Sequence, residues 1–346
     1  MANQNKLDDW FKSRKSRKKD LKANHLWKGV CSGDRFELSK AITLIESTNY
    51  QDREEASKLL KKCISSNKSS WRIGITGVPG VGKSTFIESF GKIILEKGLK
   101  LAVLAIDPSS SISGGSILGD KTRMEWLSNQ DNVFIRPTPS GLNLGGVAKH
   151  TRESILLCEA AGFDVVLIET VGVGQSETLV HSMVDFFLLL MLAGAGDDLQ
   201  GIKRGIMEMA DELVITKADG ENLTKAKLAR SQYASALHLF PPKENEWIVP
   251  TTVTSSIENN GLEEVWKHIC SYFEKYQGDG WIQQNRSRQE LLIMNQYVSE
   301  LWFSNMENNE IYQIELERLT QLVISGKLNG YMAAEELVKA IIVNQS

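Results

Sequence analysis

The segment that most constrains this chain is a glycine-rich run of nine residues that follows an apolar stretch at 72–76. It fits the pattern GxxxxGKS in full. An amphipathic stretch at 85–96 follows it, so the expected context is strand, loop and helix. Glycines allow successive backbone N–H groups to turn toward an anion, because a Cβ would block that approach. The nine residues are Gly77, Val78, Pro79, Gly80, Val81, Gly82, Lys83, Ser84 and Thr85.

Two side chains of this run indicate what kind of anion it binds. Lys83 can place its charge between the β- and γ-phosphates of a nucleotide, which makes it a catalytic candidate, and Ser84 can offer its hydroxyl to Mg²⁺. The helix that starts here adds the positive end of its dipole. The run therefore predicts a site for a nucleoside triphosphate with magnesium.

The segment from residue 71 to about 276 alternates short apolar runs with amphipathic helices. Uniformly apolar runs are typical of strands that are covered on both faces. This alternation predicts an α/β fold with a mainly parallel sheet, whose ligands bind at the carboxyl ends of the strands. The predicted strands are 72–76, 101–106, 133–136, 165–169, 186–192, 213–216 and 247–253.

Helical patterns without strands flank this segment on both sides. We predict three parts: a helical cap at 1–66, a P-loop domain at 67–280 and a helical arm at 281–346. The arm carries an apolar stripe that must be buried, either on its own domain or against a second copy of the chain. The stripe consists of Leu291, Leu292, Met294, Val298, Leu301 and Trp302.

Three acidic residues follow predicted strands or lie in a neighbouring loop. Asp107 ends the second strand, and Glu169 ends the fourth and leads into Thr170-Val-Gly172. A glycine at that position lets the backbone approach a γ-phosphate. Asp120 lies in a loop after a Gly- and Ser-rich stretch. Together with Ser84, these acids are the predicted magnesium ligands.

The choice of base depends on Thr216-Lys217-Ala218-Asp219, which follows a predicted strand. A carboxylate at Asp219 can accept two hydrogen bonds from guanine, which adenine cannot offer. Thr216 stands where GTPases usually have Asn, so the motif favours guanine without proving it. A later loop, Ser255, Ser256 and Ile257, follows the next predicted strand and supports the same choice.

Two long motifs resemble a known family. The segments from Asp107 to Met124 and from Glu169 to Glu177 are similar to those of the MeaB/ArgK GTPases, the G-protein chaperones of methylmalonyl-CoA mutase and related cobalamin-dependent acyl-CoA mutases. The resemblance covers essentially the whole chain. It implies a P-loop NTPase fold of the G-domain type with helical extensions at both ends. It also implies a Mg²⁺-dependent enzyme that hydrolyses GTP to GDP and gates cobalamin loading or rescue of the mutase, and a homodimer formed through the carboxy-terminal arm.

The resemblance assigns the site residues and adds a third switch. It places the phosphates at Gly77 to Thr85, guanine at Lys217, Asp219 and Ser255 to Ile257, and magnesium at Ser84, Asp107, Asp120 and Glu169. The segment 194–204 corresponds to a nucleotide-responsive element that faces the mutase. Gln175 is a candidate to orient the attacking water, and Arg123, Lys203 or Arg204 to stabilise developing charge.

Composition narrows the other possibilities. The 346 residues carry 40 Lys and Arg against 43 Asp and Glu, a formal charge of −3, which offers no extended basic surface for a nucleic acid. The four cysteines lack metal-ligand spacing and indicate free thiols in a reducing compartment. No apolar run has membrane-spanning length. We expect a cytoplasmic protein without nucleic-acid or membrane partners.

Two other functions remain open from the sequence. An ATPase or kinase associated with basic amino-acid transport would use the same phosphate loop, but no kinase-type catalytic loop is present and Asp219 favours guanine. A GTPase that delivers a metal would need a His- or Cys-rich tract, and the five histidines are scattered.

Overall fold

The protein is seen in a computed structural model that describes residues 22–47, 49–107, 124–139, 144–170, 176–193, 204–307 and 309–343. The strands are β1 (Trp71–Gly77), β2 (Leu101–Asp107), β3 (Val133–Pro139), β4 (Val165–Thr170), β5 (Phe186–Leu192), β6 (Glu212–Thr216) and β7 (Thr251–Val253). The helices are α2 (Ala23–Cys31), α3 (Arg35–Ile45), α4 (Tyr50–Ser65), α5 (Lys83–Glu96), α7 (Glu125–Ser128), α8 (Leu144–Ala160), α9 (Ser176–His181), α10 (Arg204–Met209), α11 (Asn222–Leu237), α12 (Leu262–Gly278), α13 (Trp281–Glu307), α14 (Glu310–Ile324) and α15 (Gly330–Val343).

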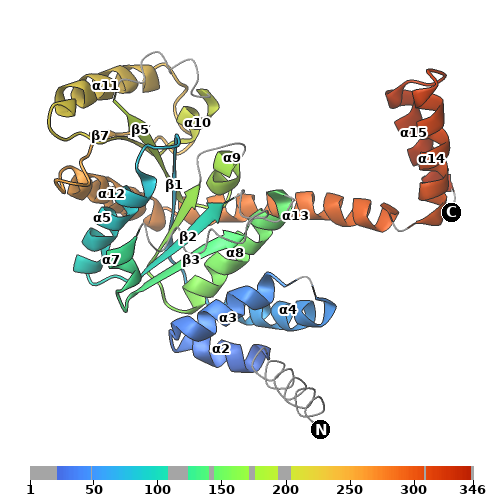
Figure 1. Cartoon of the computed structure of the whole chain (residues 1–346), viewed down its shortest axis with the longest axis horizontal. Helices are drawn as coiled ribbons and strands as arrows, with labels where there is room; N and C mark the ends of the chain where they lie inside the picture. The colour runs from blue at the N-terminus through green and yellow to red at the C-terminus, as the bar shows by residue number, and fades with distance from the viewer. Residues whose placement is uncertain are drawn as a thin grey trace, which may run out of the picture. The chain divides into compact units, whose positions relative to one another are not determined.

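Within these residues the seven strands form one sheet in the order β3-β2-β4-β1-β5-β6-β7 (Figure 1). Every neighbouring pair of strands is parallel. The carboxyl ends of all seven strands therefore lie at one edge of the sheet, which confirms the predicted α/β class and the mainly parallel sheet.

Helices cover both faces of the sheet, which explains why the strands are apolar at consecutive positions. Leu101 and Val103 of β2 pack in the cluster that includes α5 and α12, while Ala102 and Leu104 pack in the cluster that includes α8 and the N-terminal helices. A third cluster joins α10 and α11 to β5 and β6. Because successive side chains of a strand point to opposite faces, each strand needs apolar residues on both.

Three strands begin with the same local arrangement, in which an aspartate precedes the first residue of the strand. The N–H of Asp185 donates to the Arg72 carbonyl at 2.8 Å, and its carboxylate accepts the Arg72 N–H at 3.0 Å. This reciprocal pair holds the start of β5 in register with β1. The same exchange joins Asp164 to Lys100 and Asp211 to Phe187.

The N-terminal helices cover the outer strand β3 and pack on α8. Arg35 of α3 donates to the carbonyls of Gln130 and Val133 at 2.7 and 3.0 Å. Arg136 of β3 forms an ion pair with Glu46 at 2.6 Å, at the end of α3. Burial raises the pKa of Glu46, and the facing guanidinium opposes that effect. These contacts make α2, α3 and α4 part of the same compact unit as the sheet.

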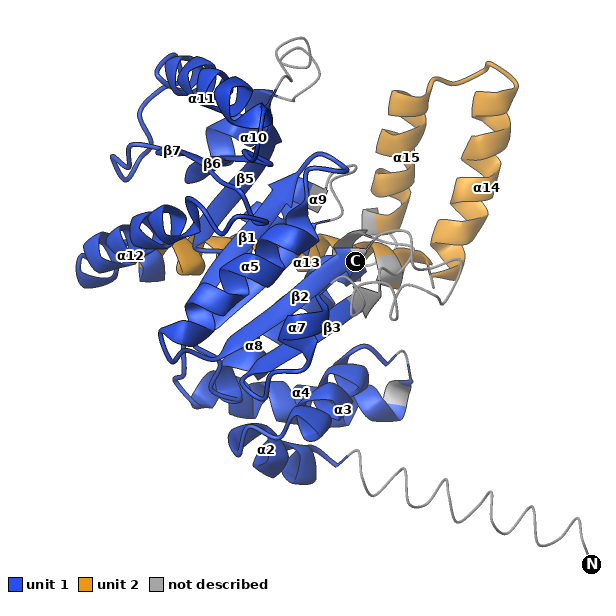
Figure 2. Ribbon diagram, turned by 60° about the vertical axis from the view of Figure 1, so that its left-hand side comes forward, with its two compact units in different colours: residues 1–283 blue, residues 284–346 orange. Residues whose placement is uncertain are grey.

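The chain divides into two compact units, residues 1–283 and residues 284–346 (Figure 2). In the second unit, α14 and α15 pair through an ion pair between Arg318 and Glu336 at 2.7 Å and bury Leu319. The six apolar residues of the predicted stripe on α13 remain 47–59% exposed in the single chain. Over the described residues, no helix combines the length and apolar character that crossing a bilayer requires.

One predicted strand is shorter than expected, because β7 includes only the last three residues of 247–253. The Trp247 indole donates to the Asp211 carbonyl at 2.8 Å, and its ring packs edge-on against Tyr272 of α12. This contact turns residue 247 away from the sheet, and strand pairing begins only after Pro250.

The short helices α7, α9 and α10 were not predicted, since each has fewer than two full turns.

We expect Asp185→Ala to lower the free energy of unfolding by about 1–3 kcal/mol, because the Arg72 N–H loses its acceptor. Asp185→Asn should lower it less, since the amide oxygen can still accept that hydrogen bond. Urea unfolding followed by circular dichroism measures both. Equal losses in the two variants would show that the reciprocal pair contributes nothing beyond packing.

Candidate nucleotide site

The glycine-rich run forms the connection between β1 and α5. The helix begins at Lys83, two residues before the predicted start at Thr85. Gly82 is the N-cap with φ of 95°, a left-handed conformation that favours glycine. No side chain among the described residues caps this end of α5. The N–H groups of its first turn are therefore available to an anion, as the motif predicts.

The ammonium group of Lys83 lies within the loop. Its Nζ donates to the carbonyls of Gly77 at 2.8 Å and Val78 at 3.3 Å. Burial lowers the pKa of Lys83, and the carboxylates of Glu169 and Glu177 counteract that effect. A cation held by neutral carbonyls, with buried acids nearby, is suited to exchange those partners for phosphate oxygens.

Two of the four predicted magnesium ligands lie together at the carboxyl edge of the sheet. The Ser84 hydroxyl donates to Glu169 Oε1 at 3.3 Å, and Glu169 is buried near the end of β4. Hydroxyl and carboxylate oxygens are ligands that Mg²⁺ prefers, so this pair fits the ion. Asp107 ends β2, which pairs with β4, but its side chain is outside the described part of the chain. Asp120 lies outside the described residues.

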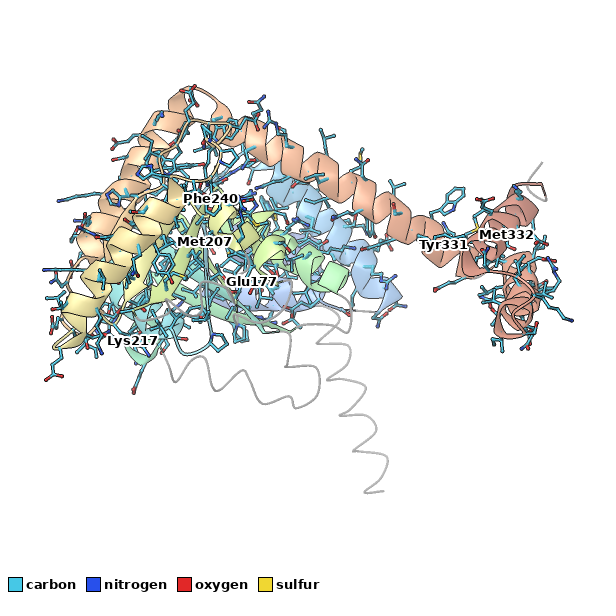
Figure 3. All side chains as sticks on the ribbon, turned by 90° about the horizontal axis from the view of Figure 1, so that it is seen from above. Glu177, Met207, Lys217, Phe240, Tyr331 and Met332 are labelled. Carbon is cyan, nitrogen blue, oxygen red and sulfur yellow. The ribbon has the colours of Figure 1, made fainter. Side chains whose placement is uncertain are left out.

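The two predicted base loops contact each other. Asp219 Oδ2 accepts the Ser255 hydroxyl at 3.1 Å, and the Ala218 N–H donates to the Thr254 carbonyl at 3.0 Å. Lys217 has φ of 56°, which is uncommon for a residue other than glycine and marks local strain. These bonds fix the Asp219 carboxylate at the rim of the site, where it can receive a base (Figure 3 labels the neighbouring Lys217).

The base loops also contact the phosphate loop and its helix. The Lys217 side chain passes over Gly82, since a Cβ built on that glycine would lie 3.7 Å from Lys217 Cε. The Ser89 hydroxyl of α5 donates to the Ser256 carbonyl at 2.9 Å. The structure therefore joins segments that are more than a hundred residues apart in the sequence into one site.

Thr216, the departure from the usual Asn, has a defined position at the end of β6. Its hydroxyl donates to the Val81 carbonyl at 2.7 Å and lies 3.3 Å from the Met191 carbonyl. One buried hydroxyl thus links the phosphate loop, β6 and the end of β5. Thr216 therefore holds the base motif against the phosphate loop through its side chain.

Several predicted residues are not brought into this site by the described structure. Gln175 and Lys203 lie outside the described residues, as do Arg123 and most of the predicted third switch. Ile257 is 78% exposed. Arg204 begins α10, where it pairs with Glu208 at 3.3 Å and lies over the Phe240 ring.

The sequence analysis missed two residues that the structure brings to the site. Glu177 was noted only as the end of a motif, yet it is buried and acts on Lys83. Ser89 of α5 was not considered, because a serine inside an amphipathic helix carries no signal by itself. Its contact with Ser256 depends on how α5 packs in the fold.

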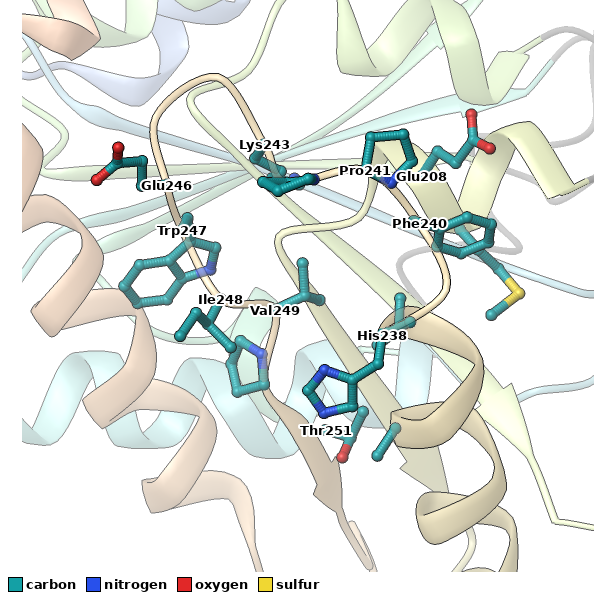
Figure 4. Close-up of a pocket in the computed structure, with 15 residues that line it drawn as sticks. Glu208, His238, Phe240, Pro241, Lys243, Glu246, Trp247, Ile248, Val249 and Thr251 are labelled. Atoms are coloured by element: carbon teal, nitrogen blue, oxygen red, sulfur yellow. The ribbon is translucent and has the colours of Figure 1, made fainter.

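A groove of about 810 Å³ lies apart from these residues, between α10, α11 and the segment before β7 (Figure 4). Phe240, Pro241, Trp247 and Ile248 give it a largely apolar lining, and Lys243 adds a charge that Asp211 pairs. None of the predicted phosphate, base or magnesium residues lines it. The groove is therefore not the nucleotide site.

A phosphate loop after β1, a guanine motif after β6 and a parallel sheet between them define a P-loop GTPase. Residues 38–310 match the family described as Methylmalonyl Co-A mutase-associated GTPase MeaB. The chain is 46% identical over 278 residues to GTPase ArgK of Escherichia coli (strain K12), which covers 80% of this chain and 84% of ArgK. The chain belongs to the MeaB family, and it is a GTPase that hydrolyses GTP to GDP and phosphate.

Two further comparisons extend the similarity over most of the chain. The Mus musculus protein named Methylmalonic aciduria type A homolog, mitochondrial, is 41% identical over 327 residues, covering 92% of this chain and 79% of that protein. A crystal structure called LAO/AO transport system kinase matches with a TM-score of 0.75 and 36% identity, covering 92% of this chain and 97% of the other. The predicted family and the P-loop fold are confirmed.

Two variants should distinguish the residue that recognises guanine, Asp219, from the residue that holds the base motif in place, Thr216. Asp219→Asn should weaken GTP binding by about 1–3 kcal/mol and favour xanthosine triphosphate, because the amide offers a donor where the carboxylate accepted. Thr216→Val should weaken GTP and xanthosine triphosphate alike, since it removes the hydroxyl that bonds to the Val81 and Met191 carbonyls and leaves Asp219 unchanged. Calorimetric titration with both nucleotides and ATP distinguishes them. Wild-type affinity for ATP equal to that for GTP would contradict the role of Asp219.

Proposed function

We propose that this chain is a Mg²⁺-dependent GTPase that acts as a G-protein chaperone of a cobalamin-dependent acyl-CoA mutase, such as methylmalonyl-CoA mutase. In this role it gates the loading of cobalamin and protects the mutase. The observation that carries the proposal is the match of residues 38–310 to a family described as mutase-associated. The similarity to a methylmalonic aciduria type A homolog over 92% of the chain supports it.

The nucleotide chemistry assigns a role to each group of residues. The N–H groups from Gly77 to Thr85 would surround the phosphates, and Lys83 would exchange the Gly77 and Val78 carbonyls for phosphate oxygens. Ser84 and Glu169 would hold Mg²⁺, with Asp107 and Asp120 completing the set. When bound, the ion would neutralise charge that develops on the phosphates. Lys217, Asp219 and Ser255 to Ile257 would enclose guanine.

Hydrolysis also requires a positioned water and stabilisation of the transferred phosphoryl group. We assign the first role to Gln175 and the second to Lys83 with Lys203. Gln175 lies between β4 and α9, directly after the segment that would approach a γ-phosphate. Lys203 immediately precedes α10. Both assignments rest on the sequence.

The response to the mutase is proposed to run through the segment 194–204. This segment connects β5 to α10, and the carbonyl of Met191 near the end of β5 faces the Thr216 hydroxyl. Ile206 and Met209 of α10 pack on the cluster that contains α9. A change at the phosphates therefore has two short routes, through β5 and through α9, to the elements on either side of this segment.

A transport-associated kinase or ATPase is the second candidate, because the matched crystal structure carries a transport system kinase name. Its nucleotide would be expected to be ATP. The fixed Asp219 carboxylate and its support by Ser255 favour guanine. Phosphorylation of an added basic-amino-acid-binding protein by ATP would favour the kinase.

We further propose that the carboxy-terminal arm, 281–346, mediates a homodimer, with 1–66 as a helical cap and 67–280 as the GTPase domain. The apolar stripe on α13 supports this, since six large side chains each remain about half exposed in the single chain. Contiguous apolar surface of this kind is typical of an interface.

The chaperone proposal is tested by GTPase rates with and without purified methylmalonyl-CoA mutase. We expect the mutase to raise the wild-type rate by about tenfold or more, since a partner group that stabilises the transferred phosphoryl group can raise GTPase rates by as much as about 10³–10⁵. Lys83→Ala should abolish turnover in both conditions, because it removes the charge matched to the phosphates. A wild-type rate that no acyl-CoA mutase changes would argue against the chaperone role, and unchanged turnover in Lys83→Ala against the assigned site.

The dimer is tested by placing a charge in the apolar stripe. Trp302→Glu should shift the full-length protein toward monomer in sedimentation velocity, because a buried unpaired carboxylate opposes association. Glu300→Gln changes an exposed neighbour on the same helix and serves as the control. A wild type that sediments as a monomer at all concentrations would refute the proposal.

A further inference from the structure

We propose that Glu177 is a specificity-determining residue that senses the γ-phosphate, because its buried carboxylate opposes the extra charge of GTP relative to GDP. The inference rests on the proposed nucleotide site and adds a residue to it. It makes Glu177 the element through which the triphosphate state acts on α9.

The packing of α9 brings Glu177 close to the phosphate loop. Gly74 of β1 lies under α9, and a Cβ built on it would be 2.8 Å from Val180 and 3.1 Å from Val184. The missing side chain therefore allows a close approach of helix and strand. Glu177 precedes Val180 by three residues and so lies on the same face of the helix, one turn toward its start. That turn lies toward the carboxyl end of β1, where the phosphate loop begins.

The charges around Lys83 place Glu177 within electrostatic range of the phosphates. The carboxylates of Glu169 and Glu177 both oppose the lowering of the Lys83 pKa by burial, so both lie within electrostatic reach of its ammonium. A P-loop lysine contacts the β- and γ-phosphates, so an acid that acts on Lys83 also acts on those phosphates. Glu177 is labelled in Figure 3 and is only 8% exposed. Solvent therefore screens its charge weakly.

The carboxylates of Glu169 and Glu177 differ in their hydrogen-bond partners. Glu169 accepts the Ser84 hydroxyl and would be neutralised by magnesium. No hydrogen bond among the described residues ends on the Glu177 carboxylate. Within the described part of the chain, its charge opposes the effect of burial on the Lys83 ammonium, and a bound nucleotide would occupy that lysine. When a nucleotide takes that lysine, Glu177 faces added negative charge, and GTP brings more of it than GDP.

Repulsion at Glu177 would act at the start of α9, which follows the segment 171–175. That segment contains Gly172 and Gln175, the predicted γ-phosphate contact and water-orienting residue. Val180 and Val184 share a cluster with Ile206 and Met209 of α10. A shift of α9 would therefore reach α10, the helix that follows the predicted third switch. Such coupling requires two conformations of the protein that differ in the position of α9 and in their affinity for GTP.

The test is the effect of Glu177→Gln on affinity for GDP and for a non-hydrolysable GTP analogue, each with Mg²⁺, by calorimetry on the full-length chain. The change is nearly isosteric and removes only the charge. We expect the ratio of analogue affinity to GDP affinity to rise about ten- to thirtyfold, the range for one extra charge roughly 8–12 Å away with an effective dielectric constant near 20. GDP should also bind more tightly, but by a smaller factor, because it lacks the γ-phosphate charge. Glu177→Asp, which keeps the charge, should retain the wild-type preference.

Matched controls separate this effect from others. Glu54→Gln removes the same charge from an exposed position on α4 and should change neither affinity. Equal changes for GDP and the analogue, or weaker binding of the analogue, would overturn the proposal, since both imply a general structural role. If Glu177→Gln is unstable, Glu177→Met removes the charge at similar side-chain length and gives the same test, and an affinity ratio that changes as little as in Glu54→Gln overturns the proposal. Failure of the wild type to bind guanine nucleotides would instead reject the proposed function.

Discussion

Parallel pairing of β4, β1, β5 and β6 is the constraint on which the site depends. Because these strands run in the same direction, the segments after them emerge at one edge of the sheet. The phosphate loop, the segment before α10 and the guanine motif each follow one of these strands, and Glu169 lies at the end of β4. A single hydroxyl, that of Thr216, then joins the ends of β5 and β6 to the phosphate loop. The geometry of the site follows from the sheet.

Charge compensation is the second organising feature. The start of the phosphate loop holds the Lys83 ammonium on neutral carbonyls, and two buried acids lie nearby. Glu169 has a hydroxyl partner and suits a metal ion, whereas Glu177 depends on Lys83 alone among the described residues. A nucleotide that enters such a site replaces weak partners of the lysine with strong ones. In the proposed site, the same exchange of partners at Lys83 would bind the nucleotide and change the charge that faces Glu177.

The sequence predicted most of the fold because its signals are local. Runs that are apolar at consecutive positions predicted six of the seven strands, with starts within one or two residues of those observed. The phosphate loop was predicted from residue types at fixed spacing. The exception, β7, depended on Trp247 turning toward α12, which is a contact between distant segments. The short helices α9 and α10 escaped prediction, since fewer than two turns give no clear periodicity. Glu177 was therefore overlooked with the helix that carries it.

The sequence by itself determined the class of chemistry: a phosphate loop, acids that suit magnesium, and a carboxylate that favours guanine. Residue type and spacing are sufficient for this, since backbone N–H groups, hydroxyls and carboxylates have fixed preferences for their ligands. The tertiary structure alone decided how Thr216 replaces Asn and why Gly74 is a glycine, and it showed which acids act on Lys83. These features depend on distances between segments about a hundred residues apart, which are set by the packing of helices on the sheet and leave no pattern in the local sequence.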